Sequence, residues 1–410
     1  MNYSHQAQRR LLKMAEEWVP IGSAFRPGRA FDTTVAYLEA MAQSRVRRIP
    51  IYTGCQTTVT LPEGLLEQLS PYYRYDAVLA AGVLEVITDY QVVAMPHGRV
   101  VSDNRMAVSY ITEEGCLLGD ISYEYDGGRA LPATEHSIMR RRWFTKPRHI
   151  EGTVFSMLSG GGSAINYGHW LVDCLPRIHL LQQSGLMAEV DWFLVPAYSA
   201  DFHFDSLGLL GIPPDKVLVA TDDTHLQADK LIACTHPRGT RSMLIPRWMI
   251  DWHQASYIHK APPAGSYPAK IYVSRRDSPL RQLQNEAEVQ ALLEGHGYST
   301  YAFAELSFLQ KVSLMAGCSH MITASGAGMN NLLYAPPQCR VLEIFPQGLV
   351  HAQFYSIAAQ LQMHYQYMIC RPKHAAATMN EGRHEKLYVS PAALEQQLSL
   401  LERQPADAGL

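Results

Sequence analysis

The sequence of 410 residues lacks a charge excess of either sign. Its 35 Lys and Arg nearly balance its 38 Asp and Glu, and the formal net charge is −3 with neutral His. No overall field therefore attracts nucleic acid, and an anionic ligand must be bound by a local cluster of cations. Apolar residues make up 47% and charged residues 18%, which is ordinary for a globular chain and excludes wholesale disorder.

The sequence also lacks any run of about 18 apolar residues, so it contains no predicted transmembrane helix. Residues 1–13 are polar and hold no apolar core of a secretory signal, which predicts a cytoplasmic protein. Residues 8–19 can form a cationic amphipathic helix with an apolar face made of Leu11, Met14, Ala15 and Trp18. Such a helix either lies on an anionic membrane or packs on its own domain. Peripheral association with the inner face of the membrane therefore stays open.

Sequence patterns that hold metals or cofactors are missing as well. The seven cysteines are scattered without a CxxC pair, which excludes the usual zinc and thioredoxin patterns and predicts buried free thiols. There is no DxD motif for a metal-bound sugar nucleotide, and Asp222-Asp223 is a poor substitute. A GxGxxG fingerprint, a Walker loop and a GxSxG elbow are also absent. We therefore expect no metal site and no cofactor.

Strand and helix patterns divide the chain into an N-terminal region, two α/β series and a tail. Residues 48–150 are rich in short predicted strands, whereas from residue 153 short apolar strands alternate with helical stretches. Such alternation predicts parallel sheets with crossover helices. A Pro/Gly-rich stretch at 261–268 separates the first series from a second one that ends near residue 369. The expected divisions are 1–150, 151–262, 268–375 and a helical tail at 376–410, with two Rossmann-like domains facing a cleft.

The first group of residues that can carry chemistry lies at 166–177, after the Gly-rich stretch 159–163. If residues 167–175 are helical, His169 and Asp173 share one face because they are four residues apart. A His beside a carboxylate can act as a general base. Alternatively, His169 and Trp170 pack in a core while Asp173 either acts as a helix cap or pairs with Arg177.

The second group follows the predicted strand 270–273. Arg275 and Arg281 lie at the carboxyl end of that strand, where open α/β sheets bind ligands. Guanidinium groups suit phosphate oxygens and can neutralise a diphosphate leaving group. Alternatively, this is a solvated loop in which Asp277 and Glu286 pair with the arginines.

The third group is a strand followed by a glycine-containing turn and a predicted helix, at residues 322–334. Backbone N–H groups at such a turn can bind phosphate. The candidate residues are Ser325, Gly326, Ala327, Gly328 and Asn331. Glu343, in the following strand, can accept hydrogen bonds from a ribose or can be an ordinary strand carboxylate.

In this order, the three groups resemble glycosyltransferase family 61, whose bacterial members are often described as capsular polysaccharide biosynthesis proteins. The family pattern Asn-aromatic-x-His-Trp-Leu-x-Asp-x-Leu-Pro-Arg is similar to Asn166 through Arg177 at every fixed position. The aromatic-hydrophobic-Ser-Arg pattern, a later Arg and an Asn-Glu pair resemble residues 272–275, Arg281 and residues 285–286. The family His before the Gly-Ala-Gly turn is Ser325 here, which puts a cationic contact with the donor phosphates in doubt.

The resemblance implies an α/β, GT-B-like fold with a β-containing N-terminal region and a nucleotide-sugar site in the C-terminal domain. It implies a metal-independent inverting glycosyltransferase that acts on a saccharide acceptor in capsule or exopolysaccharide synthesis. His169 and Asp173 are then the catalytic candidates, with Asp173 either the base or the partner that orients His169. Asn166, Trp170 and Arg177 are expected on the acceptor side, and a homo-oligomer stays open. The alternative is a catalytically degenerate subunit that binds glycan or nucleotide within a polysaccharide assembly system.

Overall fold

The computed structural model describes residues 25–70, 78–80, 82–126, 129–160, 166–239, 244–370 and 378–403. The expected amphipathic helix at 8–19 lies outside these residues, as do most of the Gly-rich stretch and the last residues of the tail. The chain forms two compact units. The first unit comprises Met1–Cys55, Thr88–Ser199 and Ile212–Thr240, and the second comprises Gln56–Ile87, Ala200–Gly211 and Arg241–Leu410.

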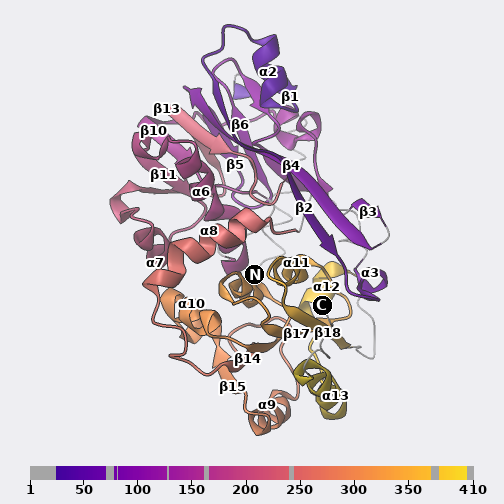
Figure 1. Ribbon diagram of the computed structural model, residues 1–410. Helices are drawn as coiled ribbons and strands as arrows, with labels where there is room; N and C mark the ends of the chain where they lie inside the picture. Colours follow the sequence, from indigo (N-terminus) through magenta and orange to yellow (C-terminus); the bar gives the residue numbers. More distant parts are fainter. Residues whose placement is uncertain are drawn as a thin grey trace, which may run out of the picture. The chain divides into compact units, whose positions relative to one another are not determined.

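The sheet of the first unit is mixed, with strand order β1-β7-β6-β5-β13-β10-β11-β12 along its main path (Figure 1). The strands on this path are β1 (Arg29–Phe31), β5 (Arg99–Ser102), β6 (Ala107–Ile111), β7 (Cys116–Leu118), β10 (Arg148–Ser156), β11 (Trp192–Val195), β12 (Val217–Val219) and β13 (Thr224–Cys234). β13, β10, β11 and β12 are parallel, as the alternating pattern predicts. β13 also pairs antiparallel with β4 and β5, so only this part of the sheet is Rossmann-like.

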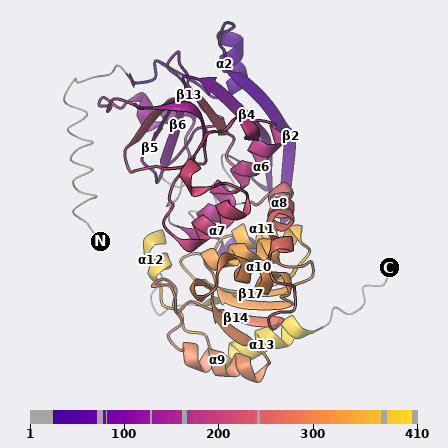
Figure 2. The ribbon, with the colours of Figure 1, turned by 90° about the vertical axis from the view of Figure 1, so that its left-hand side faces the viewer.

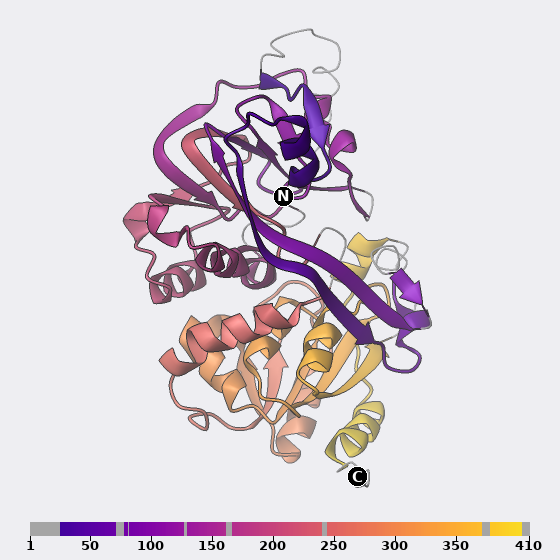
Figure 3. The same cartoon turned by 45° about the horizontal axis from the view of Figure 1, so that its top comes forward.

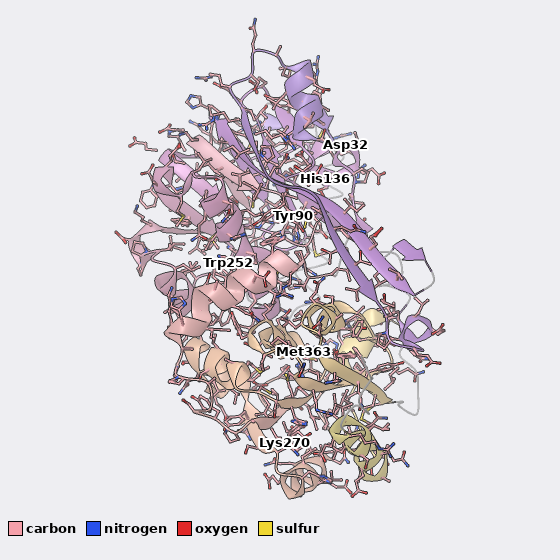
Figure 4. All side chains as sticks on the ribbon, viewed as in Figure 1. Asp32, Tyr90, His136, Trp252, Lys270 and Met363 are labelled. Atoms are coloured by element: carbon pink, nitrogen blue, oxygen red, sulfur yellow. The ribbon has the colours of Figure 1, made fainter. Side chains whose placement is uncertain are left out.

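The expected β-rich stretch at 48–150 is confirmed. It contains β2 (Arg47–Thr60), β3 (Val78–Ala80), β4 (Val83–Pro96), β8 (Tyr123–Asp126) and β9 (Arg129–Ala130), with α2 (Thr34–Ala40) before it and α3 (Leu65–Gln68) within it. β4 is longer than the short strands expected in this stretch, and it runs beside the equally long β2 (Figure 3). In Figure 4, Tyr90 is labelled on β4, where the Tyr90 hydroxyl donates to the Pro237 carbonyl oxygen at 2.9 Å.

The second unit contains an all-parallel sheet of order β15-β14-β16-β17-β18. Its strands are β14 (Lys270–Ser274), β15 (Ser299–Ala302), β16 (His320–Ala324), β17 (Arg340–Pro346) and β18 (His364–Cys370). Helices α9 (Glu286–Gly295) and α13 (Pro391–Glu402) lie on one side of the sheet, and α10 (Phe308–Ala316) and α11 (Gln353–Gln360) on the other (Figure 2). The sheet therefore forms the central layer of a three-layer α/β unit.

Local sequence accounts for the ends of these helices. Ser307 and Gln310 form a capping box at the start of α10, a helix that the sequence predicts. α13 starts with Pro391 at its first position, and Ser390 caps it. Leu394, Leu398 and Leu401 of α13 are buried in the core below the sheet. The C-terminal tail, which also contains α12 (Met379–His384), is thus part of the second unit.

The two units divide the chain differently from the expected domains. α8 (Arg247–Tyr257) belongs to the second unit, although it precedes the 261–268 stretch. His253 on α8 bonds Tyr334 at 3.1 Å, and the Gln254 side chain donates to the Leu333 carbonyl oxygen at 3.0 Å. Trp252, which is labelled in Figure 4, also lies on α8. Because α8 packs in this way, the 261–268 stretch lies inside the second unit. α7 (Asp201–Leu209) also joins this unit.

All seven cysteines lie in the described residues as free thiols, six of them buried and Cys55 half-buried, as the sequence predicts. No helix within the described ranges is long and apolar enough to cross a membrane.

Candidate functional site

The first unit places a charged cluster at the carboxyl ends of β10 and β13. After β10 the chain continues through α6 (Pro176–Gln183) to β11 on one side of β10, whereas β13 pairs on its other side. This change of direction is a topological switch point, where parallel sheets bind their ligands.

The helical segment after β10 is shaped by a cap and a wide turn. The Asn166 side chain caps α5 (Tyr167–His169) by accepting hydrogen bonds from the backbone N–H groups of Gly168 at 2.8 Å and His169 at 3.4 Å. Residues Trp170–Cys174 form a π-helical turn, a feature that is frequent at functional sites. α6 then starts at Pro176. Proline is tolerated here because a first-turn residue needs no intrahelical N–H bond.

His169 and Asp173 share one face of this segment, as their spacing predicts. His169 Nδ1 donates to Asp173 Oδ2 at 2.6 Å. The Asp173 side chain is 1% exposed and the His169 side chain 31% exposed. The Nδ1 bond to Asp173 leaves Nε2 as the nitrogen on the opposite edge of the imidazole ring. This pair therefore has the geometry of a base and its buried orienting partner.

Two residues that are not among the sequence-predicted candidates complete the cluster. Arg238 donates to both Asp173 carboxylate oxygens, from Nε at 2.6 Å and from Nη2 at 2.8 Å. His236 Nε2 lies 3.7 Å from Asp173 Oδ1. Both residues lie in the loop that follows β13, much as Arg275 follows β14, and this shared position after a strand could have revealed them.

The charges around Asp173 decide its protonation state. Burial alone would raise the pKa of Asp173, but the charge of Arg238, together with the hydrogen bond from His169, outweighs it and lowers that pKa far below its usual range. Burial lowers the pKa of His236 to about 3, so its imidazole is neutral. Asp173 is therefore a firmly ionised carboxylate that holds a proton on His169 Nδ1.

Trp170 and Arg177 are buried, at 0% and 1% exposure. Arg177 Nε donates to the Asp173 backbone oxygen at 2.9 Å, and its Nη1 donates to the Cys234 backbone oxygen at 3.2 Å. The expected contact of these two side chains with an acceptor is therefore not available in this structure. The alternative pairing of the Asp173 carboxylate with Arg177 is also corrected, because that carboxylate binds Arg238. Asn166, in contrast, is exposed.

The second unit has its own switch point between β14 and β16. When its five strands are numbered in chain order, the sheet has the order 2-1-3-4-5, which is typical of doubly wound folds. Lys270, labelled in Figure 4, marks the opposite, amino end of β14. Arg275 follows β14, and Ser325-Gly326 follow β16. A Cβ atom added at Gly326 would overlap the Arg275 guanidinium, so the absence of a side chain lets the guanidinium lie against the turn.

Arg281 also reaches this turn. Its Nε donates to the Ser325 backbone oxygen at 2.7 Å. The Arg281 backbone has a φ of 56°, in the left-handed region that is unfavourable for a residue with a side chain. Strain of this kind clusters at ligand sites, where surrounding bonds hold it. The predicted grouping of two arginines with the 325–326 turn is present in the structure.

The carboxylates near Arg275 bind other partners. Glu286 accepts hydrogen bonds from the hydroxyls of Ser274 at 2.7 Å and Tyr272 at 3.0 Å. Asp277 accepts from the Ala304 backbone N–H at 2.9 Å. Arg275 donates through Nε to the Leu280 carbonyl oxygen at 3.1 Å and through Nη2 to Ser278 Oγ at 2.9 Å. Within the described part of the chain no ion pair is found for Arg275, and the alternative of a carboxylate-paired loop does not hold for it.

A buried polar group lies under the turn. Burial raises the pKa of Glu343 to about 8, and the Tyr365 hydroxyl donates to Glu343 Oε2 at 2.7 Å. His351 Nε2 lies 3.4 Å from Ser325 Oγ, and burial, with the charges of Arg281 and Arg383, lowers the pKa of His351 to about 3. Glu343 is fully buried, so the expected contact with a ribose does not fit this arrangement.

The residues after the turn form the 3-10 helix η9 (Ala327–Tyr334). Asn331 is fully buried and its side chain donates to the Gly328 backbone oxygen at 2.8 Å. Asn331 therefore closes the turn, and a direct ligand contact for it stays a prediction, as it does for Ala327 and Gly328. No group of three or more His, Cys, Asp or Glu that could hold a metal occurs among the residues that the structure describes.

Comparison with known proteins bears on these two clusters. Residues 167–342 match the family described as Glycosyltransferase 61. The match covers less than half of the chain and includes His169, Asp173, Arg238, Arg275 and the 325–328 turn. No curated protein sequence matches the chain. Among solved structures, the chain is similar to a bacterial iron-containing dodecameric glycosyltransferase, TibC from enterotoxigenic E. coli H10407, at 12% identity and a TM-score of 0.29. That likeness covers 76% of this chain and 93% of TibC.

Proposed function

We propose that the protein is an inverting glycosyltransferase that moves a sugar from a nucleotide-sugar donor to a saccharide hydroxyl, in capsule or exopolysaccharide synthesis. The observation that carries this proposal is the His169–Asp173–Arg238 arrangement at a switch point within the span that matches Glycosyltransferase 61. It provides a partly exposed imidazole whose tautomer is set by a buried, ionised carboxylate.

In this proposal His169 is the base and Asp173 is a positioning residue. The bond to Asp173 keeps the proton on Nδ1, so Nε2 carries the lone pair that accepts the acceptor hydroxyl proton. The acceptor oxygen then forms a bond to the anomeric carbon as the bond to the nucleotide diphosphate breaks from the opposite face. Asp173 stabilises the imidazolium that forms. Its own strongly lowered pKa makes it a poor base.

Arg275, Arg281 and the 325–326 turn are proposed to bind the donor diphosphate. The guanidinium of Arg275 is partly buried, and burial lowers its pKa despite the opposing charge of Asp277, which reflects the cost of burying this cation. A bound diphosphate would remove this cost. The guanidinium groups would in turn neutralise the charge on the leaving oxygen of the diphosphate, without a metal. The neutral His351 under Ser325 supports the turn rather than adding positive charge.

The proposal is tested in two steps. A thermal-shift screen against nucleoside diphosphates and nucleotide sugars should identify a stabilising donor, because ligand binding raises the melting temperature by mass action. Transfer or slow hydrolysis of that nucleotide sugar is then measured, with and without a chelator. Donor binding with neither transfer nor hydrolysis would instead favour a binding subunit, and loss of activity with chelator would contradict a metal-independent reaction.

A further inference from the structure

The C-terminal tail brings a further arginine to the second unit's cluster. Arg383 lies in the last turn of α12, outside the span that matches Glycosyltransferase 61. Its side chain is exposed, and no ion pair of Arg383 is found within the described ranges. The proposed reaction has so far assigned no role to this cation.

α12 is held against the loop that follows β17, at the carboxyl ends of the strands. A Cβ atom added at Gly382 would lie 2.5 Å from the Gly348 backbone oxygen, so the two backbones are in direct contact. Glu385, just after α12, accepts a hydrogen bond from the Gly348 N–H at 3.4 Å. Parallel sheets bind their ligands at the carboxyl ends of their strands. Arg383, which directly follows Gly382, therefore lies at the end of the sheet that also contains the 325–326 turn.

Two arginines from different elements act on one buried imidazole. His351 lies 3.4 Å from Ser325 Oγ, and its pKa is lowered to about 3 by burial first and then by the charges of Arg281 and Arg383. Arg281 also donates to the Ser325 backbone oxygen at 2.7 Å. Both positive charges therefore act on the surroundings of Ser325. Neighbouring cations repel each other, and an anion bound near both removes that repulsion.

We propose that Arg383 binds the diphosphate of the nucleotide-sugar donor together with Arg275 and Arg281. This inference rests on the proposed function, because it adds a residue to the proposed donor site. Guanidinium groups bind phosphate oxygens in a forked geometry, which suits arginine for this role. Because the diphosphate gains a negative charge when its bond to the sugar breaks, a third cation would also favour that step.

The test is isothermal titration calorimetry with inorganic pyrophosphate, a probe that contains the diphosphate without a base or a sugar. The wild-type protein should bind it, and Arg383→Gln should weaken the binding about tenfold, the lower end of what a charge-assisted hydrogen bond contributes. The matched control is Arg403→Gln, which removes another exposed arginine of the second unit. The Arg403 backbone oxygen accepts a hydrogen bond from Arg340 at the amino end of β17, so this control lies at the opposite end of the sheet. It changes the net charge equally and should bind pyrophosphate as the wild type does.

A second variant displaces Arg383 without removing a charge. Gly382→Ala should push α12 away from the Gly348 backbone and thereby also weaken pyrophosphate binding, in a protein whose circular dichroism shows that it is folded.

The outcomes separate this inference from the proposed function. A loss of affinity in Arg275→Ala but not in Arg383→Gln would overturn this inference and leave the proposed donor site intact. An equal loss in Arg403→Gln would show a general charge effect and would also overturn it, as would unchanged binding in Gly382→Ala. A wild-type protein that does not bind pyrophosphate would overturn both this inference and the proposed donor site.

Discussion

Replacing His169 by Gln removes the proposed base while leaving its surroundings nearly intact. The His169 side chain is 31% exposed, and Asp173 keeps both of its bonds to Arg238. We therefore expect a loss of at most about 3 kcal/mol in the free energy of unfolding, the scale of one hydrogen bond to a charged group. Turnover should fall by about 10²–10⁴, the usual contribution of a general base.

Asp173→Asn has a different expected outcome. It leaves the 9%-exposed Arg238 guanidinium without its buried counter-charge. Removing one partner of a buried ion pair costs about 3–5 kcal/mol in stability. The variant should therefore show reduced thermal stability as well as reduced turnover, so His169→Gln is the cleaner test of catalysis.

Turnover is measured at saturating nucleotide sugar and acceptor, per mole of folded protein, with donor affinity determined by calorimetry. Donor affinity should not change, because His169 is assigned to the acceptor hydroxyl. The control is His149→Gln, which removes another histidine of the first unit that contacts a carboxylate, Asp229, at 3.1 Å. Near-normal turnover of His169→Gln, or an equal loss in His149→Gln, would refute the assignment of the base.

Three further predictions concern the second unit. Arg275→Ala should weaken binding of the nucleoside diphosphate by about 1.5–3 kcal/mol, measured by calorimetry. Arg276→Ala, the control, removes an exposed partner of Glu305 and should leave that affinity unchanged. Gly326→Ala should displace the Arg275 guanidinium and weaken the same binding, with a loss of about 1–3 kcal/mol in stability seen by thermal unfolding. Burial raises the pKa of Glu343 from 4.5 to about 8, so the folded state holds a proton that the unfolded state releases in this range. Stability should therefore fall as pH rises from 5 to 8, by up to about 1.4 kcal/mol per pH unit, and Glu343→Gln should remove this slope in denaturant titrations. Equal slopes in both proteins would show that Glu343 ionises normally.

Much of the second unit could be predicted from the sequence because its strands are short, apolar and separated by clear helical stretches. β14, β16, β17 and α10 lie where the periodicity predicts them. The first unit was harder to predict because the pairing of β13 with β4 and β5 joins segments that are far apart in the chain. The place of α8 depends on contacts with η9, which no local pattern encodes.

The candidate site could be predicted in part for the same reason. The spacing of four between His169 and Asp173 is a local property of a helical segment, and the structure has their side chains in contact. Arg238 lies 65 residues from Asp173, and only the parallel pairing of β10 with β13 brings them together. The sequence also does not show which candidate side chains are buried. In the structure, Arg177 and Glu343 are buried, unlike the candidates that are exposed.

The position of Arg238 also resolves which member of the His169–Asp173 pair can take a proton. A carboxylate that is 1% exposed and bonded by a bidentate guanidinium cannot accept a proton without leaving that guanidinium unpaired in a buried place. The same bonds fix the carboxylate, so it can hold the His169 ring in one tautomer and stabilise a positive charge on it. The imidazole is the partly exposed member, and its Nε2 is the group that a hydroxyl could approach. In the proposed reaction, this buried ion pair orients the base and stabilises the imidazolium that forms when the acceptor hydroxyl gives up its proton.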